Sequence, residues 1–273
     1  MEFQTQVDIK PFPKKINHDD HLLLLGSCFS DNIGAHLLHA GFHADVNPLG
    51  TLYNPVSILE ALHPTNWREF SKWLHARATF ITDSNGSTSS DLLPNPIVDN
   101  QYSNTIITFG TAWVWRLKET GMIVANCRKQ PANLFIRERL TITDIVDTWT
   151  AYLNALTHNS NSDLPVIIFT VSPLRYRIDG YHENQLSKSI LFLAIDELCR
   201  RFPHICTYFP AYEIMMDQLR DYRFYADDIH HSSSLAIEYI WQRFQETYFT
   251  IETRTQVKKY EKLYKQTQHV SHK

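Results

Sequence analysis

The sequence has few cysteines and no long hydrophobic run, the features that would indicate disulfides, a structural zinc site or a membrane anchor. Only four cysteines occur among 273 residues, and they do not form the paired CxxC motifs of structural zinc sites. No apolar stretch is long enough for a signal peptide or a membrane span, because the longest leucine run covers only residues 22–25. We therefore expect a soluble protein of the reducing cytoplasm that needs no disulfides and does not enter a membrane.

An excess of one charge sign is also missing. The chain carries 26 Lys and Arg against 29 Asp and Glu, which gives a net charge of -3. This balance argues against a nucleic-acid partner, which usually requires a basic domain. The hydrophobic content of 43% is too high for a disordered chain. A chain of this length buries roughly three quarters of its unfolded surface, so it can fold without a structural metal.

Several motifs that bind cofactors or catalyse reactions are absent. The sequence contains no GxGxxG after a strand, no GxxxxGK[ST], no HExxH and no GxSxG. A dinucleotide site, a P-loop, a zinc-protease helix and the standard α/β-hydrolase elbow are therefore not indicated. We expect no metal and no organic cofactor.

Short apolar runs that stop at turn residues alternate with helical patterns. The runs predict buried strands at residues 21–25, 105–109 and 165–171. Apolar residues at helical spacing predict helices at 30–40, 141–156 and 185–202, and another that begins at residue 233 or 234. This alternation indicates an α/β fold with a mainly parallel sheet. In such sheets ligands bind at the carboxyl ends of the strands, here the turns at 26–28, 110–111 and 172–173.

We expect one α/β domain over residues 1–250 and a polar, basic C-terminal tail over 251–273. Residues 63–104 include a Ser-rich stretch at 83–90, which fits either a lid or insertion or an ordinary surface loop. The tail has a weak helical stripe and is expected to form a solvated terminal helix.

Ser27 is the first candidate for chemistry because it lies between a buried strand and a helix. The free N–H groups at the start of that helix, including the N–H of Cys28, are suited to stabilising an oxyanion. Cys28 is a rival nucleophile, since a helix N-terminus lowers the pKa of a thiol. The ordinary alternatives are a simple turn for Ser27 and a small buried residue for Cys28.

The second candidate is the segment of residues 226–232, which contains two aspartates and two histidines. A carboxylate three residues before an imidazole can accept its N–H and fix its tautomer. Two pairings satisfy this spacing: Asp227 with His230, and Asp228 with His231. Metal binding by Asp227, His230 and His231 and a plain capping loop are the alternatives.

Six blocks of the sequence together resemble the GSCFA family, which is similar to the SGNH (GDSL-like) hydrolases. They are LGSCFS at 25–30, NPLGTLYNP at 47–55, FGTAWV at 109–114, VANCRKQP at 124–131, TVSP at 170–173 and YFPAYEIMMDQLRDYRFY at 208–225. The blocks occur in the family's order and, with their flanking residues, extend over about residues 3–245.

The resemblance implies a three-layer α/β/α fold of flavodoxin-like topology with Ser27 as the nucleophile. It aligns the family's late acid and histidine with Asp228 and His231, which selects the second of the two pairings. It also suggests Gly50 as an oxyanion donor. The third block, Gly110-Thr111-Ala112-Trp113, lacks the Asn of the wider superfamily, and Asn126 is the substitute that we consider.

These inferences predict a serine esterase that cleaves an O-acyl ester through Ser27, His231 and Asp228, with Cys28, Gly50 and Asn126 near the oxyanion. The substrate is expected to be a small-molecule or carbohydrate ester. Tyr53, Trp113 and Trp115 are candidates to line a sugar-sized pocket, although packing in the core is the more common role of such residues. An acyltransferase and a catalytically silent binding protein of the same fold remain alternatives. The sequence gives no indication of the oligomeric state.

Overall fold

A five-stranded, all-parallel sheet forms the centre of the protein in the computed structural model, which describes residues 5–74, 94–97, 101–159 and 164–270. Its strand order is β2-β1-β3-β7-β8, the flavodoxin-like order. The strands are β1 (His21–Gly26), β2 (His43–Val46), β3 (Asn104–Phe109), β7 (Val166–Val171) and β8 (Cys206–Phe209). The parallel arrangement places the carboxyl ends of these strands along one edge of the sheet.

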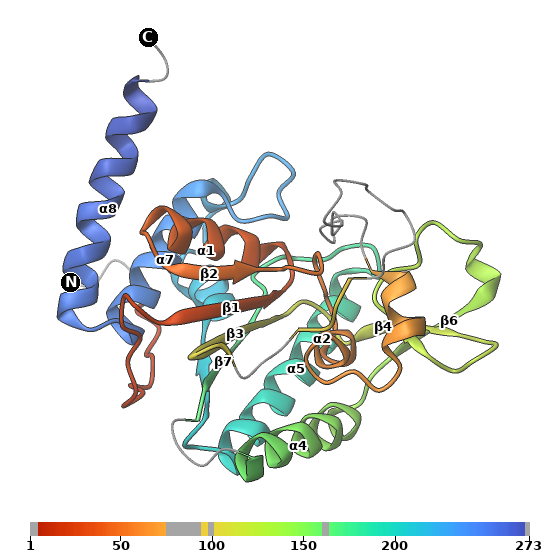
Figure 1. Ribbon diagram of the computed structural model, residues 1–273. Coiled ribbons are helices and arrows are strands. Elements are labelled where there is room, and N and C mark those ends of the chain that lie inside the picture. The colour runs from red at the N-terminus through yellow and green to blue at the C-terminus, as the bar shows by residue number, and fades with distance from the viewer. Residues whose placement is uncertain (1–4, 75–93, 98–100, 160–163, 271–273) are drawn as a thin grey trace.

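Helices cover both faces of this sheet (Figure 1). One face packs against α1 (Cys28–His39) and α7 (Ser234–Tyr248), and the other against α2 (Pro55–Leu62), α4 (Ile142–Asn159) and α5 (Tyr181–Arg201). The expected three-layer α/β/α fold is therefore confirmed.

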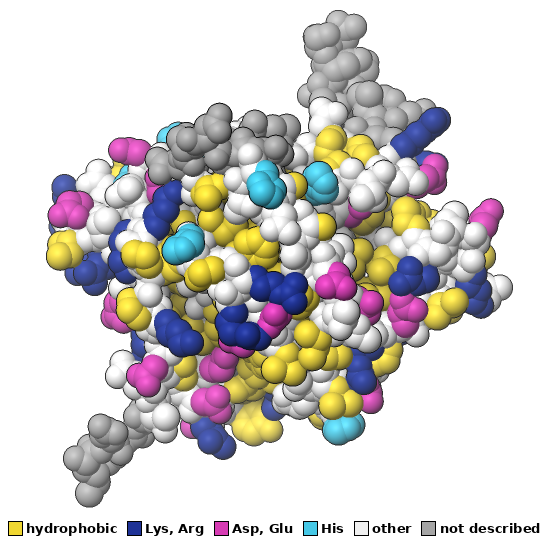
Figure 2. Space-filling model, turned by 90° about the horizontal axis from the view of Figure 1, so that it is seen from below, with side chains coloured by type: hydrophobic (Ala, Val, Ile, Leu, Met, Phe, Trp, Pro, Cys, Tyr) yellow, Lys and Arg dark blue, Asp and Glu magenta, His cyan; other side chains and the backbone are white. Residues whose placement is uncertain are grey.

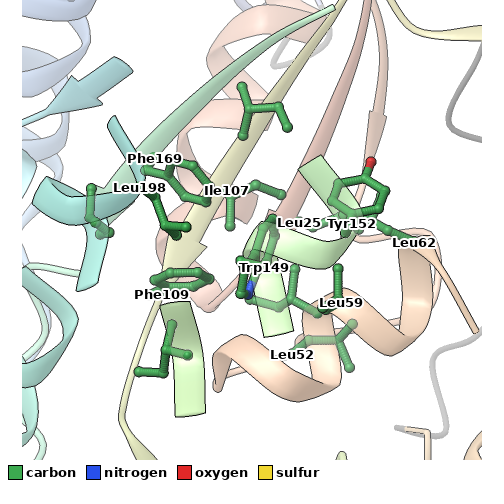
Figure 3. Packing of buried hydrophobic residues seen from close by; sticks show 14 of the residues in the cluster. Leu25, Leu52, Leu59, Leu62, Ile107, Phe109, Trp149, Tyr152, Phe169 and Leu198 are labelled. Atoms are coloured by element: carbon green, nitrogen blue, oxygen red, sulfur yellow. The ribbon is translucent and has the colours of Figure 1, made fainter. Parts of the chain in front are cut away.

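The central strands β1, β3 and β7 are mostly apolar, and both of their faces are buried. In β1, Leu22 and Leu24 point into one core, and Leu23 and Leu25 point into the other. Figure 3 shows Trp149 of α4 among residues of the second core, beside Phe109 and Phe169 of the sheet. The Trp149 indole N–H donates to the carbonyl of Pro55 at 3.2 Å, so this large side chain is buried with its polar atom satisfied.

A second, antiparallel sheet follows β3 directly and was not expected from the sequence. It has the order β5-β4-β6, with β4 (Trp113–Leu117), β5 (Ile123–Val124) and β6 (Phe135–Arg139). Only residues 110–112 separate β3 from β4, so this sheet begins at the carboxyl end of the central strands (Figure 1). Two ion pairs, Arg137–Asp179 and Arg139–Glu183, connect β6 to the start of α5.

The fold also has several short elements. Among the described residues they include α3 (Trp67–Phe70), α6 (Ala211–Glu213), a π-helical turn at Ile214–Gln218 and 3-10 turns at Ser71–Trp73, Ala132–Leu134 and Tyr222–Phe224; several of these residues, such as Leu134 and Tyr222, are exposed. The Ser-rich stretch at 83–90, where a lid or insertion was considered, lies outside the described residues.

The C-terminal segment forms helix α8 (Ile251–Val270), and one side of it packs on the body of the protein. Tyr264 stacks on His39 with ring centroids 3.8 Å apart, and Tyr260 stacks on His18 at 5.1 Å. Val257 is fully buried in the core shared with α1 and α7. These contacts attach α8 to the body between Val257 and Tyr264, while the end of the helix extends away from it (Figure 1).

Charges of both signs are mixed on the surface. On the face drawn in Figure 2, Lys and Arg side chains lie interspersed with Asp and Glu rather than in a block of one sign. None of the described helices combines the length and apolar character that crossing a bilayer requires.

Gly26 ends β1 in a conformation with φ of 143°, and it pairs with Thr108 of β3. A Cβ at this position would overlap the carbonyl oxygen of Thr108. Glycine therefore allows β1 and β3 to approach closely at the point where the chain turns toward Ser27.

We predict that Gly26→Ala lowers the free energy of unfolding by about 2 kcal/mol or more, because the new methyl group meets backbone that cannot move aside. Gly121→Ala is the matched control: Gly121 also has a positive φ, 72°, but nothing lies within 4 Å of its added Cβ. The control should cost only about 1 kcal/mol. Urea denaturation measures both values, and equal losses would contradict the steric argument.

Candidate active site

A cavity of about 720 Å³ opens at the carboxyl edge of the central sheet, against the three-stranded sheet. This volume is typical of a site for a small organic ligand. Four of the six predicted site residues line it: Ser27, Cys28, Asn126 and His231. They come from β1–α1, from the segment after β5 and from the loop before α7, so the fold brings together residues that are distant in sequence.

Ser27 is the N-cap residue of α1, with an extended backbone. Its Oγ accepts a hydrogen bond from the N–H of Phe29 at 3.3 Å, and its own N–H donates to Thr108 O at 3.3 Å. A hydroxyl that accepts one hydrogen bond still has a proton to donate. The side chain is held at the helix N-terminus, where the dipole and the N–H groups favour negative charge.

The Cys28 thiol is in a less reactive environment than the sequence position suggested. Burial, followed by the nearby Asp31 carboxylate, raises the pKa of Cys28 above its usual value. The thiolate is the nucleophilic form of cysteine, so these two effects outweigh the helix N-terminus and disfavour Cys28 as the nucleophile.

Asp228 and His231 form the hydrogen bond that the family resemblance selected. The Nδ1 atom of His231 lies 2.5 Å from Oδ2 of Asp228, and Oδ1 accepts the backbone N–H groups of His230 and His231 at 2.9 Å each. The bond from the His231 ring, with these two N–H donors, holds the pKa of Asp228 well below its usual range. The carboxylate therefore stays ionised and orients the ring through Nδ1, which leaves Nε2 available for chemistry.

The alternative pairing of Asp227 with His230 is not made. Both ring nitrogens of His230 are shielded from solvent and have no hydrogen-bond partner among the described residues. His230 also lines the cavity, whereas Asp227 does not. Within the described parts of the chain, no three His, Cys, Asp or Glu side chains are grouped to hold a metal ion.

Ser27 and His231 line the same cavity, but no hydrogen bond joins them in this structure. The Ser27 side chain is turned toward the N–H of Phe29, while the His231 side chain is about half exposed. A Ser-His-Asp triad has one hydrogen bond between the acid and the imidazole and another between the imidazole and the serine. The structure contains the first, between Asp228 and His231.

Gly50 does not fit the oxyanion-donor role expected from the resemblance. Its N–H donates to the carbonyl of Asn47 at 2.8 Å within a turn, and Gly50 is not part of the cavity lining. The N–H of Gly110 is likewise bonded to Tyr53 O. Asn126 does reach the cavity, where its Oδ1 accepts the N–H of Arg128 at 2.7 Å. This bond points the amide oxygen at the backbone and leaves the NH₂ group available.

The sequence analysis missed the polar face of α5 beneath this site. Lys188 is fully buried and donates from Nζ to Gly110 O at 2.7 Å and to Ser172 O at 2.8 Å. Ser187 Oγ accepts the N–H of Ala112 at 2.8 Å. These bonds tie together the ends of β3 and β7, so the third block is held by side chains of a neighbouring helix.

The walls of the cavity are aromatic and cationic. Tyr53, Trp113 and Trp115 all line it, as considered from the sequence. The guanidinium of Arg137 lies 4.6 Å from the ring centre of Trp115. The side chains of Arg137 and Arg175 belong to the site but carried no recognisable sequence signal.

Lys188 provides a pH test of this arrangement. Burial lowers the pKa of Lys188 to about 7, whereas an unfolded lysine titrates at about 10.4. Between these pH values the unfolded chain holds a proton that the folded chain lacks, so folding is stabilised as the pH rises. Below pH 7 both states are protonated and this slope disappears.

We predict that the stability of the wild type relative to Lys188→Met increases by about 2 kcal/mol between pH 7 and pH 9. Urea denaturation at pH 6, 7 and 9 measures the difference. Lys258→Met, at an exposed position of α8, controls for the loss of a positive charge. A difference that is constant over this range would show that Lys188 stays protonated in the folded protein.

Comparison with known proteins agrees with the blocks found in the sequence. No curated protein matches the chain significantly. The sequence profile of the GSCFA family matches residues 21–90 and 96–244, which include Ser27, Asp228 and His231. With most of its length matched, and with the α/β architecture described above, the chain belongs to the GSCFA family.

Proposed function

We propose that this protein is an SGNH-type serine esterase that cleaves an O-acyl ester through Ser27, His231 and Asp228. The observation that carries the proposal is that Ser27, at the N-terminus of α1, and His231, oriented by the Asp228 carboxylate, line one cavity. An alcohol and an acid-oriented imidazole are the two groups that acyl transfer to serine requires.

The reaction begins when Ser27 Oγ attacks the ester carbonyl carbon and its proton passes to His231 Nε2. Asp228 stabilises the imidazolium that forms. The tetrahedral intermediate collapses as His231 gives the proton to the leaving alcohol, and the acyl group stays on Ser27. Water, deprotonated by the same imidazole, then releases the acid and restores the Ser27 hydroxyl.

The negative charge on the intermediate is stabilised mainly at the start of α1. Cys28 is the first residue of that helix, so its N–H has no intrahelical acceptor. The Asn126 amide, on the opposite wall, is the second donor in this proposal. Proton transfer also requires the His231 ring and the Ser27 hydroxyl to come within hydrogen-bond distance, and in many enzymes such contacts tighten only when substrate binds.

Two alternatives keep the same cavity. If a sugar hydroxyl replaces water in the second step, the site becomes an acyltransferase, and the aromatic lining suits a carbohydrate acceptor. A silent binding protein is the other alternative, supported by the missing Ser27–His231 bond and by the engaged N–H of Gly110. The cytoplasmic location remains part of the proposal, and the four free thiols are compatible with it.

We predict that Ser27→Ala abolishes hydrolysis of p-nitrophenyl acetate, with a loss of about a thousandfold or more in kcat. Cys28→Ala is the matched control one residue away and should keep most of the activity, because burial disfavours its thiolate. A fluorophosphonate reagent should label the wild type and Cys28→Ala but not Ser27→Ala. Labelling that follows Cys28 would contradict the serine mechanism, and equal background rates in all three proteins would favour the silent binding protein.

The acid and the base can be tested with neighbouring residues of the same type. Asp228→Asn should lower kcat about a hundredfold or more, since the ring loses its oriented tautomer and the stabilising charge. Asp227→Asn, at an exposed position outside the cavity, should leave kcat within about twofold. His231→Gln should be as inactive as Ser27→Ala. Inactivation by His230→Gln with activity retained in His231→Gln would assign the reaction to the other pairing.

A further inference from the structure

The proposed active-site cavity has a charge that differs from that of the whole protein. Three arginines line it, Arg137, Arg175 and Arg177, while none of the described residues that line it is Asp or Glu. The complete chain, by contrast, has a net charge of -3. Positive charge has therefore been concentrated at the place where a ligand would bind.

Among the described residues, a carboxylate partner is found for one of these arginines, Arg137. Arg137 forms a two-point contact with Asp179, with Nε–Oδ1 at 3.0 Å and Nη2–Oδ2 at 2.5 Å. Arg175 and Arg177 have no carboxylate within ion-pair distance among the described residues. Arg175 donates to the carbonyl of Ile229, the residue that follows Asp228. The Asp228 carboxylate, however, is already bonded to the His231 ring and to two backbone N–H groups.

Arg175 is held in place without its charge being balanced. Its Nη2 donates to the carbonyl of Ile229 at 3.2 Å, and its guanidinium carbon lies 4.8 Å from the ring centre of Tyr225. The rings of Tyr181 and Tyr222 lie at 5.5 and 5.8 Å. Aromatic rings around a guanidinium hold its plane but leave the N–H groups on its edge free to bind an acceptor.

Several polar atoms of the cavity residues also lack acceptors. The Nε of Arg175, the indole Nε1 of Trp113 and both ring nitrogens of His230 are shielded from bulk water and have no partner among the described residues. An unpaired buried donor is costly, so such groups indicate a ligand that accepts hydrogen bonds. The arginine and indole atoms can only donate, so they require a ligand with acceptor atoms. The positive charge of Arg175, which has no carboxylate partner among the described residues, favours an anionic acceptor over a neutral one.

Much of the remaining cavity lining is apolar. Val114, Trp115, Val124, Leu174 and Ile178 contribute hydrophobic surface between the charged groups. A bare inorganic anion would leave this surface unused. The lining therefore suits an anionic group attached to a hydrocarbon chain or ring.

We propose that the ester substrate carries an anionic group, a carboxylate or a phosphate, that binds the free edge of Arg175, with Arg177 adding positive charge at the mouth of the cavity. This inference rests on the proposed function, because it names the substrate class of the same site. The anion is held by charge-assisted hydrogen bonds, the apolar walls contact the adjoining carbons, and the ester carbonyl is presented to Ser27.

Two esters of equal chain length test this proposal. Mono-4-nitrophenyl succinate and 4-nitrophenyl butyrate differ at the far end of the acyl chain, where a carboxylate replaces a methyl group. The wild type should show a kcat/KM for the succinate ester about tenfold or more above that for the butyrate ester, since a charge-assisted hydrogen bond is roughly twice as strong as a neutral one. The ratio should decrease with added salt.

Arginine variants test whether Arg175 is the source of the preference for the succinate ester. Arg175→Gln should bring the succinate-to-butyrate ratio close to one, Arg175→Lys should restore part of it, and Arg177→Gln should reduce it less. Arg116→Gln is the control, since Arg116 of β4 is paired with Glu138 of β6 and lies outside the cavity lining. A wild-type ratio near one, or a ratio unchanged in Arg175→Gln, would overturn the proposal.

A binding measurement separates this inference from the esterase mechanism. Calorimetric titration of Ser27→Ala with monomethyl succinate, methyl butyrate and phenyl phosphate requires no turnover. The proposal is supported, even if no ester is hydrolysed, when either anion binds more tightly than methyl butyrate and this difference is lost in the Ser27→Ala/Arg175→Gln double variant. The anion that binds more tightly shows whether the site prefers a carboxylate or a phosphate. Hydrolysis that depends on Ser27 without any anion preference would overturn the inference and leave the esterase standing.

Discussion

The close contact between β1 and β3 is the constraint on which the proposed site depends. Gly26 lets the end of β1 lie against the carbonyl of Thr108, and the next residue, Ser27, then caps the N-terminus of helix α1. The same approach allows the Ser27 N–H to donate to Thr108 O. With a side chain at position 26 the strands would separate, and the first residue of the site would lose its fixed position relative to the sheet edge where the cavity opens.

The parts of the fold that are buried on both faces could be predicted from the sequence. β1, β3 and β7 are continuous apolar runs bounded by turn residues, and their predicted ranges agree with the structure to within one residue at each end. The short strands β2 and β8 were missed because each has four residues, too few for a pattern. The helix α5 was found, but its apolar residues do not mark the whole buried face: Leu193 is 56% exposed, while Ser187 and Lys188 are buried. Hydrophobic periodicity could not detect a face that is polar where it supports the site.

The candidate site was predictable where residues act through local geometry. The spacing of Asp228 and His231 allows a hydrogen bond across one turn, and the structure contains it. Gly50 was assigned by resemblance alone, and its N–H is used within its own turn. Arg175 was overlooked for a different reason: an isolated arginine in a loop has no motif, and its significance emerges only when the fold places it in a cavity that has no acid among its described lining residues.

The three-stranded sheet is part of the site rather than an appendage to it. Its strands and the segment after β5 supply Trp113, Trp115, Asn126 and Arg137 to the cavity. Ser27 and His231 come from the N-cap of α1 and from the loop before α7. The loop between the two sheets is fixed by Lys188 and Ser187, which hold the backbone of Gly110 and Ala112. Those residues stand where the wider superfamily is expected to carry an asparagine donor. In this chain the loop has a structural role. In the proposed mechanism, the oxyanion is therefore stabilised by the N-terminus of α1 and by Asn126, in the segment after β5. Both sheets must therefore be folded and tied together before the site can act.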